Sequence, residues 1–164
     1  MDSVQHSASV HDMWKAYLQL LGEEPATTAK TFTAWHFCDN EADANELAAL
    51  VRAGEKRATA SALWAYDTDG EPLPRVGDHS VIIDWEGEAQ CVIRTTSVEI
   101  VPFNQVTADF AQTEGEGDRS LDHWRRVHWE CFTRDLRAVG KGPEETMPVV
   151  CEKFELVHGA AAGS

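Results

Sequence analysis

The sequence is poor in basic residues. Lysine and arginine together number 14, against 28 aspartates and glutamates, which gives a formal net charge of −14. Proteins that grip long nucleic acids through many phosphates normally present a basic face. We therefore expect no long duplex partner, although a local basic cleft could still hold one nucleotide or a short single strand.

Long apolar stretches and closely spaced cysteines are also lacking. No apolar run approaches the ~18 residues needed to cross a bilayer. Residues 1–11 have neither the basic n-region nor the apolar h-region of a secretory signal. We expect no membrane partner and a cytoplasmic location. The cysteines include no CxxC pair, which indicates reduced, mostly buried thiols rather than disulfides or a zinc site; they are Cys38, Cys91, Cys131 and Cys151.

Several common motifs are absent as well. The chain has no HExxH, Walker, GxGxxG or GxSxG sequence. Each of these motifs positions a metal, a phosphate or a nucleophile through a defined local geometry. Zinc proteases, nucleoside triphosphatases and dinucleotide enzymes are therefore disfavoured.

What remains is typical of one globular domain. The chain has 164 residues, of which 43% are hydrophobic and 26% charged. We expect a single domain over residues 12–158, with flexible tails at 1–11 and 159–164. Asp12 is the expected cap of the first helix. Apolar periodicity predicts helices at 12–21, 41–53, 103–111 and 120–139, and strands at 29–38, 58–66, 80–85, 90–101 and 149–157.

The order of these elements favours an α+β fold. Strands that follow one another through hairpin-length connections usually pair antiparallel. Helices at both ends of the strand series can cover such a sheet from outside. The sequence therefore predicts a mainly antiparallel, curved sheet that forms a small open β-barrel with flanking helices.

The first candidate site follows the glycine that ends the second predicted helix, in Gly54-Glu55-Lys56-Arg57-Ala58-Thr59. Lys56 and Thr59 could hold a phosphate, or the lysine could activate the threonine hydroxyl. An amine acts as a general base only when burial or a neighbouring cation lowers its pKa, and Arg57 supplies such a cation. The alternative is a solvated basic edge.

The second candidate is the acidic, glycine-rich stretch Glu114-Gly115-Glu116-Gly117-Asp118. Glu114 could serve as a general acid or base, and Glu114, Glu116 and Asp118 could hold a divalent cation. The alternative is that this stretch leads into the following helix, with Asp118 or Ser120 as the N-cap and acidic residues favoured by the helix dipole.

The third candidate is the last long helix. Trp124 and His128 are i,i+4 neighbours on one face, with Arg125 beside them. If that face lines a cleft, the aromatic and arginine side chains could stack on or clamp a base. Otherwise the histidine is a hydrogen-bonded core residue. Tyr66, at the end of a predicted strand, joins Arg57, Trp124, Arg125 and His128 as a candidate substrate-binding residue.

Together these segments resemble the ASCH family, whose domains are related to the PUA fold. The matching stretches span about residues 35–157, and their order and spacing carry the resemblance. They are Trp35-His36-Phe37, Glu46-Leu47-Ala48, Leu50-Val51, Gly54 to Thr59, Leu73 to Asp78, Val101-Pro102-Phe103, Phe110-Ala111, Glu114 to Asp118, Trp124-Arg125 with His128, and Val149 to Phe154.

The resemblance implies a small PUA-like β-barrel with flanking helices and a cleft suited to RNA or nucleosides. In short amidohydrolase members of the family, a Lys-x-x-Thr pair and a later glutamate act on N4-acetylcytidine. Lys56, Thr59 and Glu114 stand at the matching positions. Longer members resemble single-strand ribonucleases that use a divalent metal, and this chain is similar to them in its EGEGD loop and Trp-Arg helix.

Three functions follow as expectations. The first is amide hydrolysis on a modified cytidine, in which Lys56 deprotonates Thr59, Thr59 attacks the acyl carbon and Glu114 shuttles a proton. The second is cleavage of single-stranded RNA with Mn²⁺ or Mg²⁺ as cofactor. The third is a non-catalytic module that binds RNA or a nucleotide. In all three the partner is a nucleoside or short single-stranded RNA, and the oligomeric state stays open.

Overall fold

The structure of the protein is a computed structural model that describes residues 6–67 and 72–159. The helices are α1 (Ala8–Leu20), α2 (Glu41–Arg52), α3 (Ala108–Glu114) and α4 (Leu121–Arg137), and the 3₁₀ helices are η1 (Leu63–Asp67) and η2 (Phe103–Gln105). The strands are β1 (Phe32–Trp35), β2 (Ala58–Ala62), β3 (His79–Ile83), β4 (Ala89–Pro102) and β5 (Pro148–His158). No helix within these two ranges is long and apolar enough to span a membrane.

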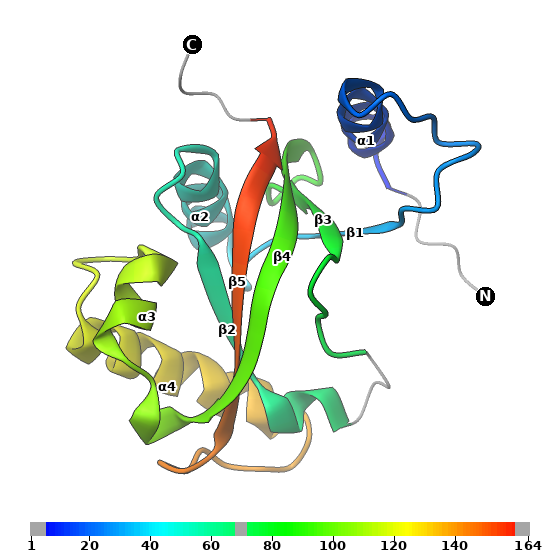
Figure 1. Cartoon of the computed structure of the whole chain (residues 1–164). Helices are drawn as coiled ribbons and strands as arrows, with labels where there is room; N and C mark the ends of the chain where they lie inside the picture. The colour runs from blue at the N-terminus through cyan, green and yellow to red at the C-terminus, as the bar shows by residue number, and fades with distance from the viewer. Residues whose placement is uncertain (1–5, 68–71, 160–164) are drawn as a thin grey trace. The chain divides into compact units, whose positions relative to one another are not determined.

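The five strands form one mixed sheet in the order β1-β3-β4-β5-β2 (Figure 1). β3 pairs antiparallel with β4, and β2 pairs antiparallel with β5, whereas β1 pairs parallel with β3. β1 and β2 are the edges of this order, so the sheet is not closed. The predicted α+β class with an open sheet and flanking helices is confirmed, with one parallel pair in the sheet.

The contacts of the chain cluster into two compact units, each built from separate stretches. One comprises residues 1–55, 77–94 and 155–164, and the other comprises residues 56–76 and 95–154. β4 and β5 contribute residues to both. The single domain expected over residues 12–158 stays a prediction, and the expected tails lie largely outside the described residues.

In the first unit, α1 packs against β3 through an apolar stripe. Val10, Trp14, Tyr17 and Leu18 are its buried residues, at the spacing of one helix face. Ser7 is the N-cap, so the helix begins at Ala8 and residues 8–11 are helical, not part of a tail. The predicted start at Asp12 is wrong because Val10 belongs to the same buried stripe.

The predicted boundaries of α2 are confirmed by its caps. The Asn40 side chain accepts a hydrogen bond from the backbone N–H of Asp43, which satisfies one of the donors that a helix start leaves unpaired. Ala53 is the C-cap and Gly54 follows with a φ of 77°. A left-handed glycine at this position is the usual helix ending.

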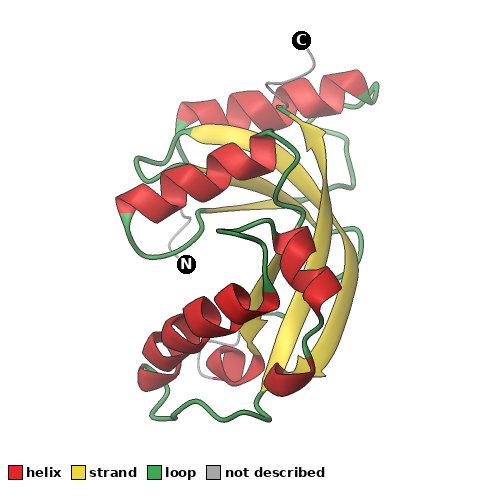
Figure 2. Ribbon diagram, turned by 90° about the vertical axis from the view of Figure 1, so that its left-hand side faces the viewer, coloured by secondary structure: helices red, strands yellow, loops and turns green. Residues whose placement is uncertain are grey.

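In the second unit, α3 and α4 lie against β2 (Figures 1 and 2). Ala58 and Ala62 of β2 are fully buried in the core there, and small side chains allow helices to approach a strand closely. β2 ends at Ala62, before the predicted end at Tyr66. Trp64 and Ala65 both pack against the core, which an alternating strand does not permit, so η1 forms instead.

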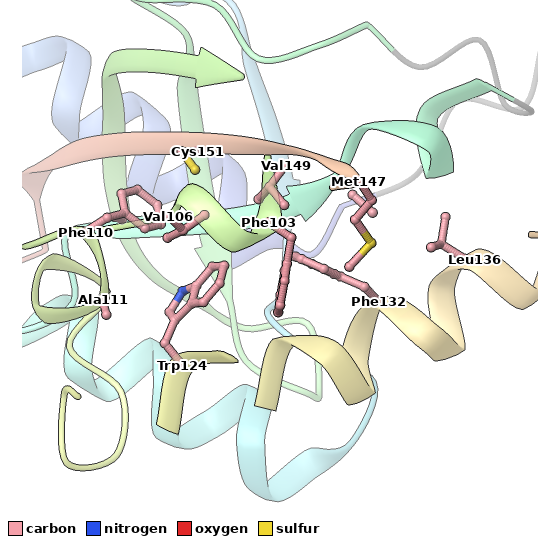
Figure 3. Close-up of a cluster of buried hydrophobic side chains, with 12 residues drawn as sticks. Phe103, Val106, Phe110, Ala111, Trp124, Phe132, Leu136, Met147, Val149 and Cys151 are labelled. Atoms are coloured by element: carbon pink, nitrogen blue, oxygen red, sulfur yellow. The ribbon is translucent and has the colours of Figure 1, made fainter. Parts of the chain in front are cut away.

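The core of this unit is an aromatic cluster beneath the two helices (Figure 3). Phe103 lies between the rings of Trp124 and Phe132, with centroid distances of 5.5 and 6.3 Å. Phe110 of α3 meets Trp124 edge to face at 6.3 Å. α3 begins at Ala108, later than predicted, because Thr107 caps it and extended Val106 separates it from η2. The aromatic contacts fix α3 and α4 beside the segment that precedes β2.

Candidate functional site

Lys56 lies just before β2 and is almost completely buried, with 1% of its surface exposed. Its ammonium donates to the backbone oxygen of Ala58 at 2.7 Å, to Oε1 of Glu114 at 3.1 Å and to Oε1 of Glu116 at 3.0 Å. Glu114 is equally buried. Two of the residues predicted as catalytic, Lys56 and Glu114, are therefore brought together as a buried ion pair.

Backbone contacts and strand alternation explain the direction of the Lys56 side chain. The N–H of Arg57 donates to the carbonyl of Thr113 at 2.9 Å, which joins this segment to the last turn of α3. Lys56 also has the same parity as Ala58, whose side chain faces the core under α3 and α4. Alternation therefore directs Lys56 toward the helices.

Glu114 is held from the opposite side by α4. It is the last residue of α3, and Gly115 ends the helix in the left-handed conformation at a φ of 71°. Oε2 of Glu114 accepts a hydrogen bond from Nε1 of Trp124 and lies 3.1 Å from Nε2 of His128. The carboxylate thus contacts three nitrogen donors from two segments of the second unit, Lys56 before β2 and Trp124 and His128 of α4.

His128 is positioned as a donor at both ring nitrogens. Its Nδ1 lies 2.8 Å from the carbonyl oxygen of Trp124, which can only accept, so this nitrogen carries a hydrogen. Its Nε2 faces the Glu114 carboxylate. The His128 and Trp124 rings are stacked, with centroids 4.3 Å apart and planes at 16°. The geometry therefore favours the imidazolium form.

The charges of the cluster reinforce one another. Burial alone would lower the pKa of Lys56, but the carboxylates of Glu114 and Glu116 outweigh it and raise that pKa. Burial likewise opposes the charged form of Glu114, but the charges of His128 and Lys56 and the hydrogen bonds of His128 and Trp124 hold its pKa below the usual value. His128 is desolvated too, yet Glu114 raises its pKa.

This charge state corrects one expectation. A general-base role for Lys56 required a lowered pKa, and the structure has the opposite direction. Lys56 is therefore an ammonium that stabilises two carboxylates. Removing one member of a buried ion pair leaves the other charge unpaired, at a cost of about 3–5 kcal/mol. The cluster consequently joins β2, α3 and α4 firmly.

The glycine-rich loop after α3 contributes Glu116 to this cluster. Glu116 is the most exposed member of the cluster, with 17% of its side chain accessible. Gly117 has a φ of 57°, and an added Cβ would lie 2.2 Å from Nε2 of His123. The left-handed backbone favours glycine at this position, and the His123 ring would have to shift to admit a Cβ.

Thr59 lies apart from the cluster in the alternation of β2. Ala58, Ala60 and Ala62 face the helices, so Thr59 points to the other face of the strand. Its cross-strand partner is Glu152 of β5. Strand alternation therefore directs Thr59 away from the Lys56 ammonium, whereas the prediction placed the two groups together.

The other predicted ligand contacts are dispersed. Arg57 is exposed, and half-buried Tyr66 shares a hydrogen bond of 2.8 Å with the hydroxyl of Ser61. Arg125 donates to the carbonyl of Asn104 at 3.3 Å. Trp124 and His128 are buried, so they contact Glu114 rather than forming part of an exposed ligand-binding surface. These placements leave Arg57 exposed and Tyr66 and Arg125 half-buried among the predicted substrate contacts.

Sequence analysis overlooked one polar residue, Glu152. It lies in the middle of β5, only 9% exposed, and accepts a hydrogen bond from the hydroxyl of Thr95 at 2.8 Å. The available signal was a carboxylate inside the apolar run that starts at Val149. Acidic residues are rarely buried in a strand without a specific partner or role.

The donor set does not fit a divalent metal in this arrangement. Among the described residues, Glu114, Glu116 and His128 offer ligand atoms that lie within 4.8 Å of one another. The ammonium of Lys56 already bridges the two carboxylates, and His128 donates with the nitrogen that a metal would need. Asp118, predicted as a third ligand, instead accepts from the N–H of Ser120 at the start of α4.

Comparison with known families identifies what the chain resembles. The model of the family described as "ASCH domain" matches residues 33–158. Among curated proteins, none matches the chain.

Solved structures agree with that match. An ASCH domain from Lactobacillus crispatus JV V101 is 35% identical, with a TM-score of 0.87 over 96% of this chain and 99% of the other. Protein EF3133 from Enterococcus faecalis V583 is 33% identical, with a TM-score of 0.80 over 92% of this chain and 88% of the other. Hypothetical protein PH0355, at 14% identity and a TM-score of 0.52 over 77% of this chain and 99% of the other, shows similarity of fold alone.

The buried charges predict how stability depends on pH. Glu114 has a lowered folded pKa, so its contribution is present above its ordinary value of 4.5 and is lost as the pH falls. His128 has a raised folded pKa, so its contribution is complete below its ordinary value of 6.5 and is lost as the pH rises through the folded value. We expect the stabilisation from this pair to be greatest between these two values.

Urea unfolding of the wild type and of His128→Gln at a series of pH values measures this effect. We expect a difference in the free energy of unfolding of about 1.5–3 kcal/mol near pH 6, which shrinks at alkaline pH. His36→Gln, outside the cluster, is the control. A difference that stays the same at pH 6 and pH 10 would contradict the ionic role of His128.

Gly117→Ala tests the packing of the loop. The new Cβ would meet the His123 ring at a positive φ, so we expect a loss of about 1–3 kcal/mol in the free energy of unfolding. Gly142→Ala is the matched control, because no heavy atom lies within 4 Å of its added Cβ. Equal melting temperatures for the two variants would refute the requirement for glycine at position 117.

Proposed function

The chain belongs to the ASCH domain family, a PUA-like RNA-binding fold, and we propose that it binds a nucleoside or a short stretch of single-stranded RNA. The observation that carries this proposal is the family match over residues 33–158. The strong negative charge of the chain supports a small ligand, since a net charge of −14 disfavours the binding of long polyanions.

The state of the charge cluster supports binding over catalysis. Lys56 and Glu114 are each 1% exposed, and each satisfies the charge of the other. Groups in that state touch a ligand only after they are uncovered. We propose that the cluster holds α3, α4 and the glycine-rich loop in place, while more exposed residues such as Arg57 and Tyr66 make the contacts with the ligand.

Titration of short fluorescent single-stranded RNAs tests binding. We expect saturable binding whose affinity falls gently with salt, with a logarithmic slope of about −1 to −2, because few phosphates are contacted. Arg57→Gln should reduce that slope by about 0.7. Arg137→Gln, an exposed arginine at the end of α4, is the control. The proposal fails if neither single strands nor nucleosides bind.

A second candidate function is hydrolysis of the N4-acyl amide of a modified cytidine. The observation in its favour is the 3.1 Å contact between Lys56 and Glu114, two of the three residues that match amidohydrolase members of the family. Thr59 would attack the acyl carbon and form an ester, and cytidine would leave as its amine took up a proton. Water would then cleave the ester into a carboxylate and free Thr59. Because strand alternation directs Thr59 away from Glu114, this reaction requires a change in the backbone at residues 56–59. Because its pKa is raised, Lys56 would act as a hydrogen-bond donor once a shift of Glu116 uncovered it.

Incubation with N4-acetylcytidine, followed by chromatography of the products, tests this activity. We expect cytidine and acetate from the wild type and a loss of at least about 100-fold in rate for Thr59→Val, because the nucleophile is removed. Thr96→Val, an exposed threonine on β4, is the matched control. Either an inactive wild type or a fully active Thr59→Val variant would end the hydrolase proposal and leave binding intact.

A further inference from the structure

His79 is a buried histidine that lies outside the charge cluster, in the first unit of the chain. It is the first residue of β3, is 8% exposed, and stands in register with Phe32 of β1. Histidine is the side chain whose ordinary pKa lies closest to neutral pH, so small changes in acidity alter its charge. A histidine that is enclosed in the core can therefore make a pH-sensitive contact.

Helix α1 supplies the enclosure. The Trp14 ring meets the His79 ring edge to face with centroids 5.5 Å apart, and the Tyr17 ring lies at the same distance. The hydroxyl of Tyr17 shares a hydrogen bond of 3.2 Å with Nε2 of His79. His158 of β5 also approaches Tyr17, with ring centroids 6.4 Å apart. Trp14 and Tyr17 belong to the buried stripe of α1, so this face of the helix packs on the imidazole.

The surroundings of His79 disfavour a positive charge on its ring. Burial has the largest effect, and the positive charges of Arg94 in β4 and Lys30 in the loop after α1 add to it. The carboxylates of Asp78 and Glu23 act in the opposite direction, but Glu23 is paired with Lys30 at 2.5 Å. The balance lowers the pKa of His79 below its ordinary value of 6.5. The ring is therefore neutral at pH 7 while α1 is in place.

Protonation changes both the hydrogen bond and the hydration of this ring. An imidazolium carries a hydrogen on each nitrogen, so Nε2 can no longer accept from the Tyr17 hydroxyl. A charge enclosed by the rings of Trp14 and Tyr17 also gives up much of its hydration. Both costs disappear when α1 opens and His79 reaches water. Because the open form binds the proton more tightly, acid favours opening.

The other histidines near α1 do not have this placement. His11 is exposed on the helix, and His6 and His158 are half-buried. A ring that already contacts water gains little hydration when α1 opens. His79 is therefore the histidine through which acid acts on this helix.

We propose that His79 makes the attachment of α1 to the sheet sensitive to pH. With a neutral ring the helix packs on Val81 and Val92, and protonation in mild acid raises the frequency with which it opens. Helix α1 lies outside residues 33–158, which match the family model, whereas His79 lies within them. The contact thus regulates how a segment beyond the matched region covers the sheet, and it does not depend on RNA binding.

Amide hydrogen exchange of the full chain, followed by mass spectrometry, tests this proposal. Peptides that cover α1, α2 and α4 are compared at pH 7.5 and pH 5.0, after correction for the intrinsic exchange rate. A histidine with a pKa of 6.5 in the open form permits at most a roughly 30-fold change in opening between these pH values. We expect α1 to lose about tenfold in protection, and α2 and α4 to keep theirs within about twofold.

His79→Gln keeps a polar side chain beside Tyr17 and removes the ionisable ring. The protection of α1 in this variant should change by less than about twofold between the two pH values. His11→Gln, on the exposed surface of the same helix, is the matched control and should keep the wild-type response. NMR titration of the His79 ring in the wild type measures its pKa directly, so the test does not depend on the folding of a variant.

The proposal is supported if His79 titrates below 6.5 and α1 alone loses protection as the pH falls. It is overturned if His79 titrates at or above that value, or if the protection of α1 is the same at both pH values. An equal loss in all three helices also overturns it, because acid then acts on the whole fold. A folded His79→Gln variant that keeps the wild-type response has the same consequence.

Discussion

The buried ion pair between Lys56 and Glu114 is the interaction on which the second unit depends. Lys56 comes from the start of β2 and Glu114 from the end of α3, 58 residues later in the chain. Trp124 and His128 of α4 complete the contacts of the carboxylate. An unpaired charge here would be costly in the absence of water, so the three elements stabilise one arrangement together.

This interaction also sets what the site can do chemically. A lysine between two carboxylates is protonated, and a glutamate among three nitrogen donors is ionised. Neither is poised for proton transfer while the cluster is intact. The same ammonium contacts the carboxylates of both Glu114 and Glu116, which would have to serve as ligands of a divalent cation. Recognition of a ligand by the neighbouring, more accessible residues is the simplest function consistent with these charges.

The two faces of β2 divide these roles. On one face the alanines pack under the helices, next to the charge cluster. On the other, Thr59 stands beside Glu152 and Ser61 contacts Tyr66. The Lys-x-x-Thr spacing therefore sends its lysine and its threonine to opposite sides, because an odd separation along a strand reverses the direction of the side chain. In this protein Lys56 lies in the charge cluster, and Thr59 lies opposite Glu152 on the other face.

Local patterns determined much of the fold. The caps Asn40 and Ser120, the glycine at position 54 and the apolar run that starts at Val149 predicted elements that the structure contains, because each depends on residues within a few positions. The start of α1 and the end of β2 were missed, since Val10 and Trp64 are positioned by tertiary packing that outweighs local signals.

For the site, the sequence by itself determined the residue types and family resemblance that singled out Lys56 and Glu114. Only the tertiary structure decided their partners and charge. The pKa of Lys56 depends on two carboxylates that lie far from it in sequence, and the position of Thr59 beside Glu152 depends on strand register. Electrostatic interactions act through space, so chemistry that depends on distant neighbours is settled only when the chain has folded.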